Sequence, residues 1–120
     1  MSQDLYAEAC SVCVSKVRDT AIVEVAGEVD IASSSLLAKA LADASKDGQF
    51  NVIVDAQHLT YIDSIGVATL LTCRDSVISH DRRFALVGCH GIFYKLVEIT
   101  RLTDKFRMFQ SVDEALAALP

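Results

Sequence analysis

Short apolar runs alternate with longer amphipathic segments along most of the chain. Val12–Val17 and Ala21–Ala26 predict two strands that are joined by the tight Arg18-Asp19 turn and form an antiparallel hairpin. Glu24 stands between two valines, which is the alternation of a strand with one solvated face. Gly27-Glu28-Val29-Asp30 then interrupts this pattern, so we expect the strand to end there.

The middle of the chain predicts helices and buried strands in turn. Ile31–Lys46 is rich in Ala and Leu, and its stripe of Leu37, Leu41 and Ala44 indicates a helix. Phe50–Ala56 is apolar without alternation, which is typical of a strand buried on both faces. A polar loop is expected next, followed by a helix from Asp63 whose apolar positions are Val67, Leu70, Leu71, Val77 and Ile78.

The C-terminal third continues the alternation. Arg83–Gly88 predicts another buried strand, and Ile92, Leu96 and Ile99 suggest the apolar stripe of a third helix. Phe106–Phe109 predicts a short strand. Ser111 and Glu114 have the spacing of a capping box, which predicts a last helix running through Leu119.

The resulting order, β-β-α-β-α-β-α-β-α, indicates an α/β fold. Repeated strand–helix units give parallel strands with right-handed crossovers, so we predict a mostly parallel sheet with an N-terminal antiparallel strand and four main helices. A chain of 120 residues suits one domain, whose core sustains the fold without a metal or a disulfide. We assign residues 1–11 to an N-terminal segment and residues 12–120 to the domain.

Composition and charge exclude several classes of function. The chain has 16 acidic and 11 basic residues, which argues against a nucleic-acid interface built on phosphate neutralisation. Its 52% hydrophobic content excludes intrinsic disorder. No apolar run approaches the ~20 residues that cross a bilayer, and the N-terminus lacks the features of a secretory signal. We therefore expect a cytoplasmic protein without membrane insertion.

Cysteines and histidines give little support for catalysis or metal binding. Cys10 and Cys13 form a lone C-x-x-C whose odd spacing on a strand would point the two thiols to opposite faces. Cys73 and Cys89 lie within apolar patterns and are expected to act as small core residues. We expect no metal and no cofactor; redox sensing by the thiols is a separate, weaker hypothesis. The histidines have no short ligand spacing: His58, His80 and His90.

The segment from Leu59 to Gly66 carries the strongest candidate chemistry. A buried strand precedes it, and a helix begins at Asp63-Ser64, where hydroxyl and carboxylate side chains usually serve only as caps. The same position also suits a phosphate, because a helix N-terminus presents unpaired amides and a partial positive charge. Gly66 would permit another backbone to approach closely. Both interpretations stay open on the residues alone.

Two motifs resemble the STAS family, the bacterial anti-sigma factor antagonists. The stretch from Leu59 to Leu71 is similar to the family signature, and Gly27-Glu28-Val29-Asp30 is similar to its other characteristic motif. The resemblance runs from Val12 to Leu119 and agrees with the predicted order of elements. It implies a non-enzymatic protein–protein switch.

The resemblance implies a cycle of partner binding and phosphorylation. The unphosphorylated protein would bind an anti-sigma factor that is also a serine kinase, and would thereby release a sigma factor. Phosphorylation of Ser64 by that kinase, with its own Mg-ATP, would end the binding, and a PP2C-type phosphatase would reset the cycle. The partner-binding residues would be Asp30, Asp63, Ser64, Ile65 and Gly66.

The chain departs from the family pattern in two places. Ile65 follows the candidate serine where many members have a small residue, and Arg101 replaces a glycine at the end of the third helix. Another role for the same fold also stays open, namely a scaffold of a stress complex or a cytosolic regulator of a transport system. A serine hydrolase is disfavoured because Ile62 occupies the position of the glycine that such enzymes place two residues before the nucleophile.

Overall fold

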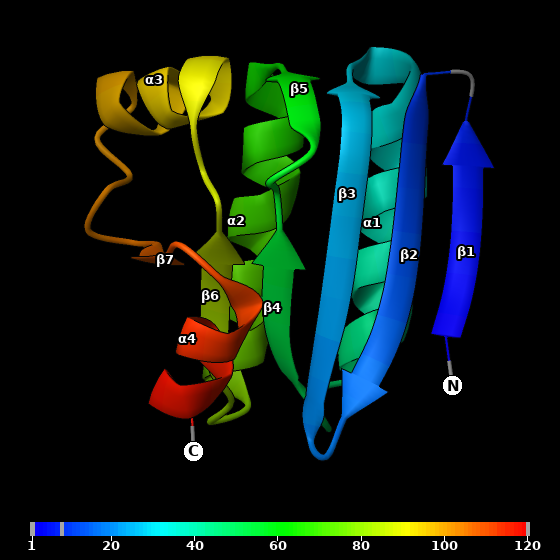
Figure 1. Cartoon of the computed structure of the whole chain (residues 1–120), viewed down its shortest axis with the longest axis vertical. Coiled ribbons are helices and arrows are strands. Elements are labelled where there is room, and N and C mark those ends of the chain that lie inside the picture. Colours follow the sequence, from blue (N-terminus) through cyan, green and yellow to red (C-terminus); the bar gives the residue numbers. More distant parts are fainter. Residues whose placement is uncertain (1, 8, 120) are drawn as a thin grey trace.

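The computed structural model describes residues 2–7, as backbone, and residues 9–119. Over these residues the chain forms seven strands and four helices around one sheet (Figure 1). In chain order the elements are β1 (Ser2–Ala7), β2 (Cys10–Val17), β3 (Thr20–Val29), α1 (Ile31–Ser45), β4 (Asn51–Asp55), β5 (Leu59–Ile62), α2 (Ser64–Ser79), β6 (Phe84–Val87), α3 (Gly91–Ile99), β7 (Arg107–Phe109) and α4 (Val112–Ala118).

The sheet combines antiparallel and parallel pairing. β1, β2 and β3 pair antiparallel, and Val17 lies opposite Thr20 across the tight turn predicted from the sequence. β3, β4, β6 and β7 then pair in parallel, in that order across the sheet. β1 adds an edge strand within residues 1–11, where the sequence analysis expected no element. The predicted α/β class, with a mostly parallel sheet and four helices, is confirmed.

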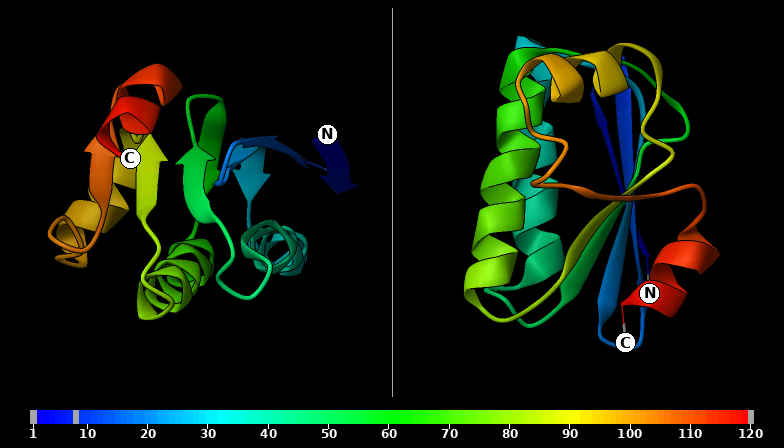
Figure 2. Two further views of the ribbon diagram at one scale, coloured as in Figure 1. Left: turned by 90° about the horizontal axis from the view of Figure 1, so that it is seen from below. Right: turned by 90° about the vertical axis from the view of Figure 1, so that its left-hand side faces the viewer.

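Helices cover the two faces of the sheet unequally. α1, α2 and α3 lie on one side, and α4 lies on the other (Figure 2). Successive residues of β4 therefore pack in different layers: Val52 and Val54 belong to the large core shared with α1 and α2, whereas Ile53 belongs to a smaller cluster with Ala115 of α4. This two-sided burial explains why the strand is apolar without alternation.

The prediction of a polar loop after β4 is wrong in part, because Leu59–Ile62 forms the strand β5. β5 pairs in parallel with the end of β3, beyond the point where β4 stops. The expected end of β3 at Gly27 is also wrong: the strand continues to Val29 through a register shift. Gly27 adopts φ +89°, and a Cβ there would collide with the carbonyl oxygen of Ala9, so a glycine is needed at this bulge.

Two helix predictions also need correction. In α3 the buried positions are Phe93 and Val97, whereas Ile92 and Ile99 of the predicted stripe are exposed. In α4 the capping box is only half formed, since Ser111 Oγ accepts from the backbone N–H of Glu114 at 3.1 Å but Glu114 accepts from Gln110. By contrast, the stripe predicted for α1 is buried as expected.

Candidate functional site

Two helix N-termini lie side by side at the carboxyl end of the parallel strands. Val29, the last residue of β3, pairs with Ile62, the last residue of β5. The backbone N–H of Asp63 donates to the carbonyl of Val29 at 3.1 Å, which fixes the two strand ends together. Each strand is followed by one aspartate and then by a helix, so Asp30 and Asp63 occupy equivalent positions at the starts of α1 and α2 (Figure 1).

Asp30 holds the first turn of α1. Its Oδ1 accepts from the backbone N–H groups of Ala32 at 3.0 Å and Ser33 at 3.2 Å. The hydroxyl of Ser33 in turn accepts from the backbone N–H of Asp30 at 2.9 Å, which completes a capping box. Asp30 is thus a predicted site residue that also caps α1; the three-residue spacing of Asp30 and Ser33 is the signal that could have indicated the box.

Asp63 and Ser64 begin α2 as the sequence predicted. Asp63 Oδ1 accepts from the backbone N–H of Gly66 at 2.9 Å, and Ser64 is the first helical residue. The side chain of Ser64 is exposed, and its hydroxyl makes no hydrogen bond with the residues whose side chains are described. The N–H groups of Ser64 and Ile65 have no acceptor within the helix, because they belong to its first turn. Ser64 therefore presents an unengaged hydroxyl at the positive end of a helix.

Gly66 lies beneath this surface. It is buried, and a Cβ at this position would come 3.0 Å from Cγ1 of Val29 in β3. The absence of a side chain thus permits α2 to pack closely against the strand ends. Its role in the structure is to set the position of Ser64 relative to the sheet.

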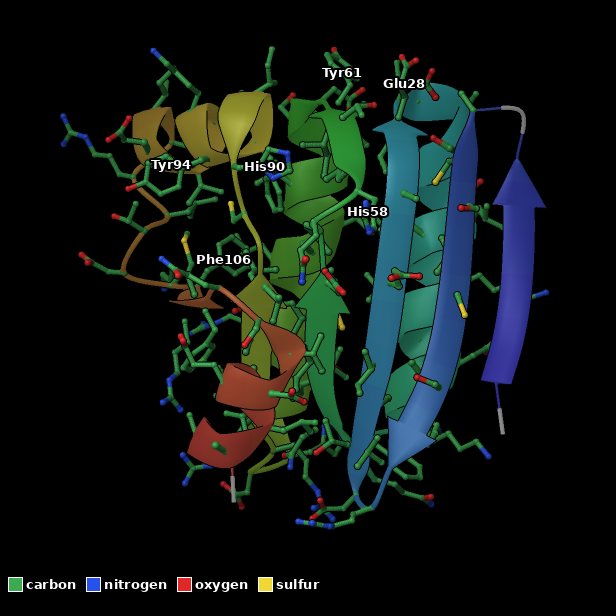
Figure 3. All side chains as sticks on the ribbon, viewed as in Figure 1. Glu28, His58, Tyr61, His90, Tyr94 and Phe106 are labelled. Carbon is green, nitrogen blue, oxygen red and sulfur yellow. The ribbon has the colours of Figure 1, made fainter. Side chains whose placement is uncertain are left out.

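Carboxylates dominate the charge around Ser64. Glu28 pairs across the strands with Tyr61, and both side chains are exposed at the same edge of the molecule (Figure 3). Asp30 is exposed and Asp63 half-buried. Over residues 9–119 the ion pairs join Arg74 to Asp75 and Arg82 to Asp19, and none involves these three carboxylates. The side chains of Glu28, Asp30 and Asp63 thus lie outside the side-chain ion pairs of the described residues.

The histidines do not complete a catalytic group with Ser64. His80 follows the last residue of α2, about 24 Å from Ser64 along the helix axis, and its Nδ1 lies 2.8 Å from the carbonyl oxygen of Ser76. His90 stands at the N-cap position of α3 without a capping side-chain hydrogen bond, and its Nδ1 lies 2.6 Å from the carbonyl oxygen of Gly88. The hydrogen bonds of residues 9–119 include none from a histidine to Ser64.

All four cysteines are thiols; Cys10 and Cys73 are buried, and Cys13 and Cys89 are half-buried. Cys10 is buried and Cys13 only half-buried, as expected for opposite faces of β2. Burial raises the pKa of Cys73 and of Cys89 to about 12. Burial, with a further contribution from Asp30, also raises the pKa of Cys10. These three thiols stay protonated near neutral pH, which makes them poor nucleophiles.

Within the described part of the chain, no cluster of three or more His, Cys, Asp or Glu side chains is arranged to hold a metal ion. The described helices likewise include none with the length and apolar character needed to traverse a bilayer.

The comparison with protein families decides the identity of the domain. The model of the STAS domain matches residues 12–115. The chain belongs to the STAS-domain family. This match covers both N-terminal caps, Ser64 and the core strands of the sheet, and it confirms the resemblance found in the sequence.

Three similar proteins illustrate the range of this STAS domain's relatives. The anti-sigma-F factor antagonist RsfB of Mycobacterium tuberculosis is 20% identical over 93% of this chain and 91% of its own length. A crystal structure of an anti-sigma factor antagonist from Mycobacterium paratuberculosis superposes with a TM-score of 0.84 at 21% identity, covering 96% of this chain and 98% of that one. The Bacillus cell fate determinant SpoIIAA in its phosphorylated form gives a TM-score of 0.72 at 18% identity, covering 89% and 97%.

Proposed function

We propose that this STAS domain is an anti-sigma factor antagonist that phosphorylation of Ser64 switches off. In the unmodified state it binds an anti-sigma factor that is also a serine kinase, and a sigma factor is released for transcription. The observation that carries the proposal is the exposed, unengaged hydroxyl of Ser64 on a surface formed by two paired helix N-termini. The names of the similar proteins support the same role.

The chemistry requires no catalytic group from this chain. Ser64 Oγ attacks the γ-phosphorus of the ATP that the kinase holds with Mg²⁺, the bond to the β,γ-bridging oxygen breaks, and ADP leaves. The hydroxyl proton passes to a base of the kinase. Ser64 suits this acceptor role because no hydrogen bond to the described residues has to break before the attack.

The fold tolerates the phosphate, whereas the docked partner does not. The unpaired N–H groups at the start of α2 and the dipole of that helix favour a nearby anion. The new charge, nearly two units, joins the carboxylates of Glu28, Asp30 and Asp63, none of which forms an ion pair with a described side chain. A partner that covered this edge would have to desolvate the phosphate, so binding weakens.

The remaining candidate residues have distinct roles in this proposal. Asp30 and Asp63 contribute negative charge to the partner surface while they cap their helices. Ile65 contributes an exposed apolar side chain directly after the acceptor serine. Gly66 acts from below, because its close packing positions the first turn of α2. A PP2C-type phosphatase would remove the phosphate and restore binding in the cytoplasm.

The test is phosphotransfer by purified serine kinases of the anti-sigma factor class, followed by intact-mass measurement. We expect one added phosphoryl group on the wild-type chain and none on Ser64→Ala. Ser76→Ala is the matched control, because Ser76 is also exposed on α2 but lies near the far end of the helix, and this variant should accept the phosphoryl group normally. Equal labelling of Ser64→Ala would contradict the proposal. Stable association with transporter or scaffold subunits without phosphotransfer would favour the alternative role.

A further inference from the structure

Large apolar side chains are exposed around Ser64. Ile31 is 72% exposed, Tyr61 40%, Ile65 46% and Ile92 52%. They come from four elements, since Ile31 begins α1, Tyr61 belongs to β5, Ile65 is the second residue of α2 and Ile92 is the second residue of α3. We call these four residues the apolar rim.

The pairing of β3 with β5 brings the rim together. Tyr61 lies beside Glu28 in the parallel register, and Ile31 and Ile65 each follow shortly after the paired strand ends. α3 packs against β5, which brings the start of α3 to the same end of the molecule (Figure 1). The rim residues therefore lie at the same end of the molecule, although 61 positions separate the first from the last.

The folded chain alone does not explain the rim. Single exposed apolar residues are common on protein surfaces, but a group of large ones on one edge marks an interaction site. The side chains of Ile31 and Ile65 occupy first-turn helix positions where a β-branched residue brings no conformational advantage. The core beneath them is already closed by Val29, Ile62 and Val67, each at most 3% exposed.

The charged side chains beside the rim indicate which kind of partner covers it. The carboxylates of Glu28, Asp30 and Asp63 border it, and within residues 9–119 none of them forms an ion pair with a lysine or arginine. The side chains of Asp30 and Asp63 also each commit an Oδ1 to a helix cap, which fixes these charges at the edge of the rim. A second copy of this chain would place like charges opposite one another, so a partner with basic groups is favoured.

We propose that the apolar rim is the affinity-determining part of the docking surface, and that it fits an anti-sigma factor surface with an apolar cavity bordered by arginine or lysine side chains. This inference rests on the proposed function, because it names the partner surface that meets Ser64. Burial of the rim supplies affinity, and the bordering carboxylates orient the partner. Ser64 lies inside this contact, so a phosphate added there would have to enter a desolvated apolar surface.

The experiment measures the affinity of rim variants for the purified kinase that phosphorylates Ser64. Ile31→Ser and Ile65→Ser should each weaken binding about tenfold, since each removes one apolar side chain from a buried contact. Ile78→Ser is the matched control, because Ile78 lies on α2 with Ile65 and is 42% exposed, but near the opposite end of the helix. Its affinity should stay within about twofold of wild type. Affinity should also fall as salt is raised.

Three outcomes would overturn the inference while the proposed function stood: rim variants that bind like wild type, an Ile78→Ser variant that is equally weakened, or binding that does not respond to salt. A self-association of this chain that Ile65→Ser abolishes, seen by sedimentation, would also overturn it, because the rim would then be covered by a second copy. Absence of phosphotransfer to Ser64 would instead contradict the proposed function itself, and the inference with it.

Discussion

Gly66 of α2 and Ile62 of β5 pack so closely that a Cβ on Gly66 would lie 2.6 Å from Cγ1 of Ile62. This contact joins the helix that carries Ser64 to the strand that precedes it. The side chain of Ile62 is also buried, at 1% exposure, so it has little room to yield. The position of the phosphorylation candidate is thus set by packing in the core.

Gly66→Ala should therefore destabilise the protein, in spite of the higher helix propensity of alanine. Forcing a methyl group into a packed core costs roughly 1–3 kcal/mol, and urea unfolding would measure the loss. The double variant Gly66→Ala/Ile62→Ala should be less destabilised than the sum of the two single changes, because the second change removes the atoms that collide. Additive effects would show that the contact is not the cause.

Asp63 has a structural role that can be separated from its charge. Asp63→Ala should lower the free energy of unfolding by about 1 kcal/mol, because the N–H of Gly66 loses its capping acceptor. Asp63→Asn should stay within a few tenths of a kcal/mol of wild type, since asparagine caps as well as aspartate. Its affinity for the anti-sigma factor should nevertheless fall, because the carboxylate charge is gone. An Asn variant as unstable as the Ala variant would contradict this separation.

Arg101 supports a specific prediction about stability. It adopts φ +60° immediately after Thr100, the C-cap residue of α3. There its N–H donates to the carbonyl of Glu98 at 3.1 Å and the N–H of Leu102 donates to that of Val97 at 2.8 Å, which is a Schellman motif. The left-handed conformation disfavours any residue with a Cβ, so Arg101→Gly should raise stability by about 0.5–1 kcal/mol. Thermal unfolding tests this; a lower melting temperature would contradict it.

The buried thiol of Cys73 predicts a loss of stability in alkali. Burial raises the pKa of this group from 9.0 to about 12. Between these pH values the thiol is ionised in the unfolded protein but stays protonated in the folded one. The contribution of the protonated Cys73 thiol to stability is therefore complete below pH 9 and is lost as the pH rises towards 12. The expected slope is about 1.4 kcal/mol per pH unit for the one thiol. Urea unfolding across this range should show a shallower slope for Cys73→Ala; equal slopes would contradict the assignment.

Much of the fold could be predicted from local pattern. β6 and the centre of β4, Val52-Ile53-Val54, are apolar because both faces of these strands are covered, and the stripe of α1 is regular enough to identify its buried face. β5 could not be predicted in this way. Its central residues, Thr60 and Tyr61, are exposed, and the strand exists because β3 extends beyond β4 and offers an unpaired edge. That edge is a property of the assembled sheet.

α3 shows a second limit of pattern analysis. Its sequence holds two competing apolar stripes, one through Ile92 and Ile99 and one through Phe93 and Val97. Periodicity alone does not choose between them, and the structure buries the second. The choice depends on how the helix lies across the sheet end.

The candidate site could be predicted only in part, because local chemistry is visible in the sequence and tertiary proximity is not. Local chemistry predicts a helix start at Asp63 and Ser64, and the structure places them there. The proximity of Asp30 comes from the pairing of Val29 with Ile62, which only the tertiary structure reveals. The exposure of Ile31 and Tyr61 was also unpredictable, because apolar residues are expected to be buried.

The central claim is that one phosphoryl group on Ser64 ends the binding of an anti-sigma factor, and its most direct test compares affinities before and after stoichiometric phosphorylation. Calorimetric titration of the purified anti-sigma factor with each form, in the same buffer and salt, gives both dissociation constants. The phosphorylated form should bind at least about tenfold more weakly, which corresponds to about 1.4 kcal/mol, while its circular dichroism spectrum stays that of the folded protein. Equal affinity of the two forms would contradict the account.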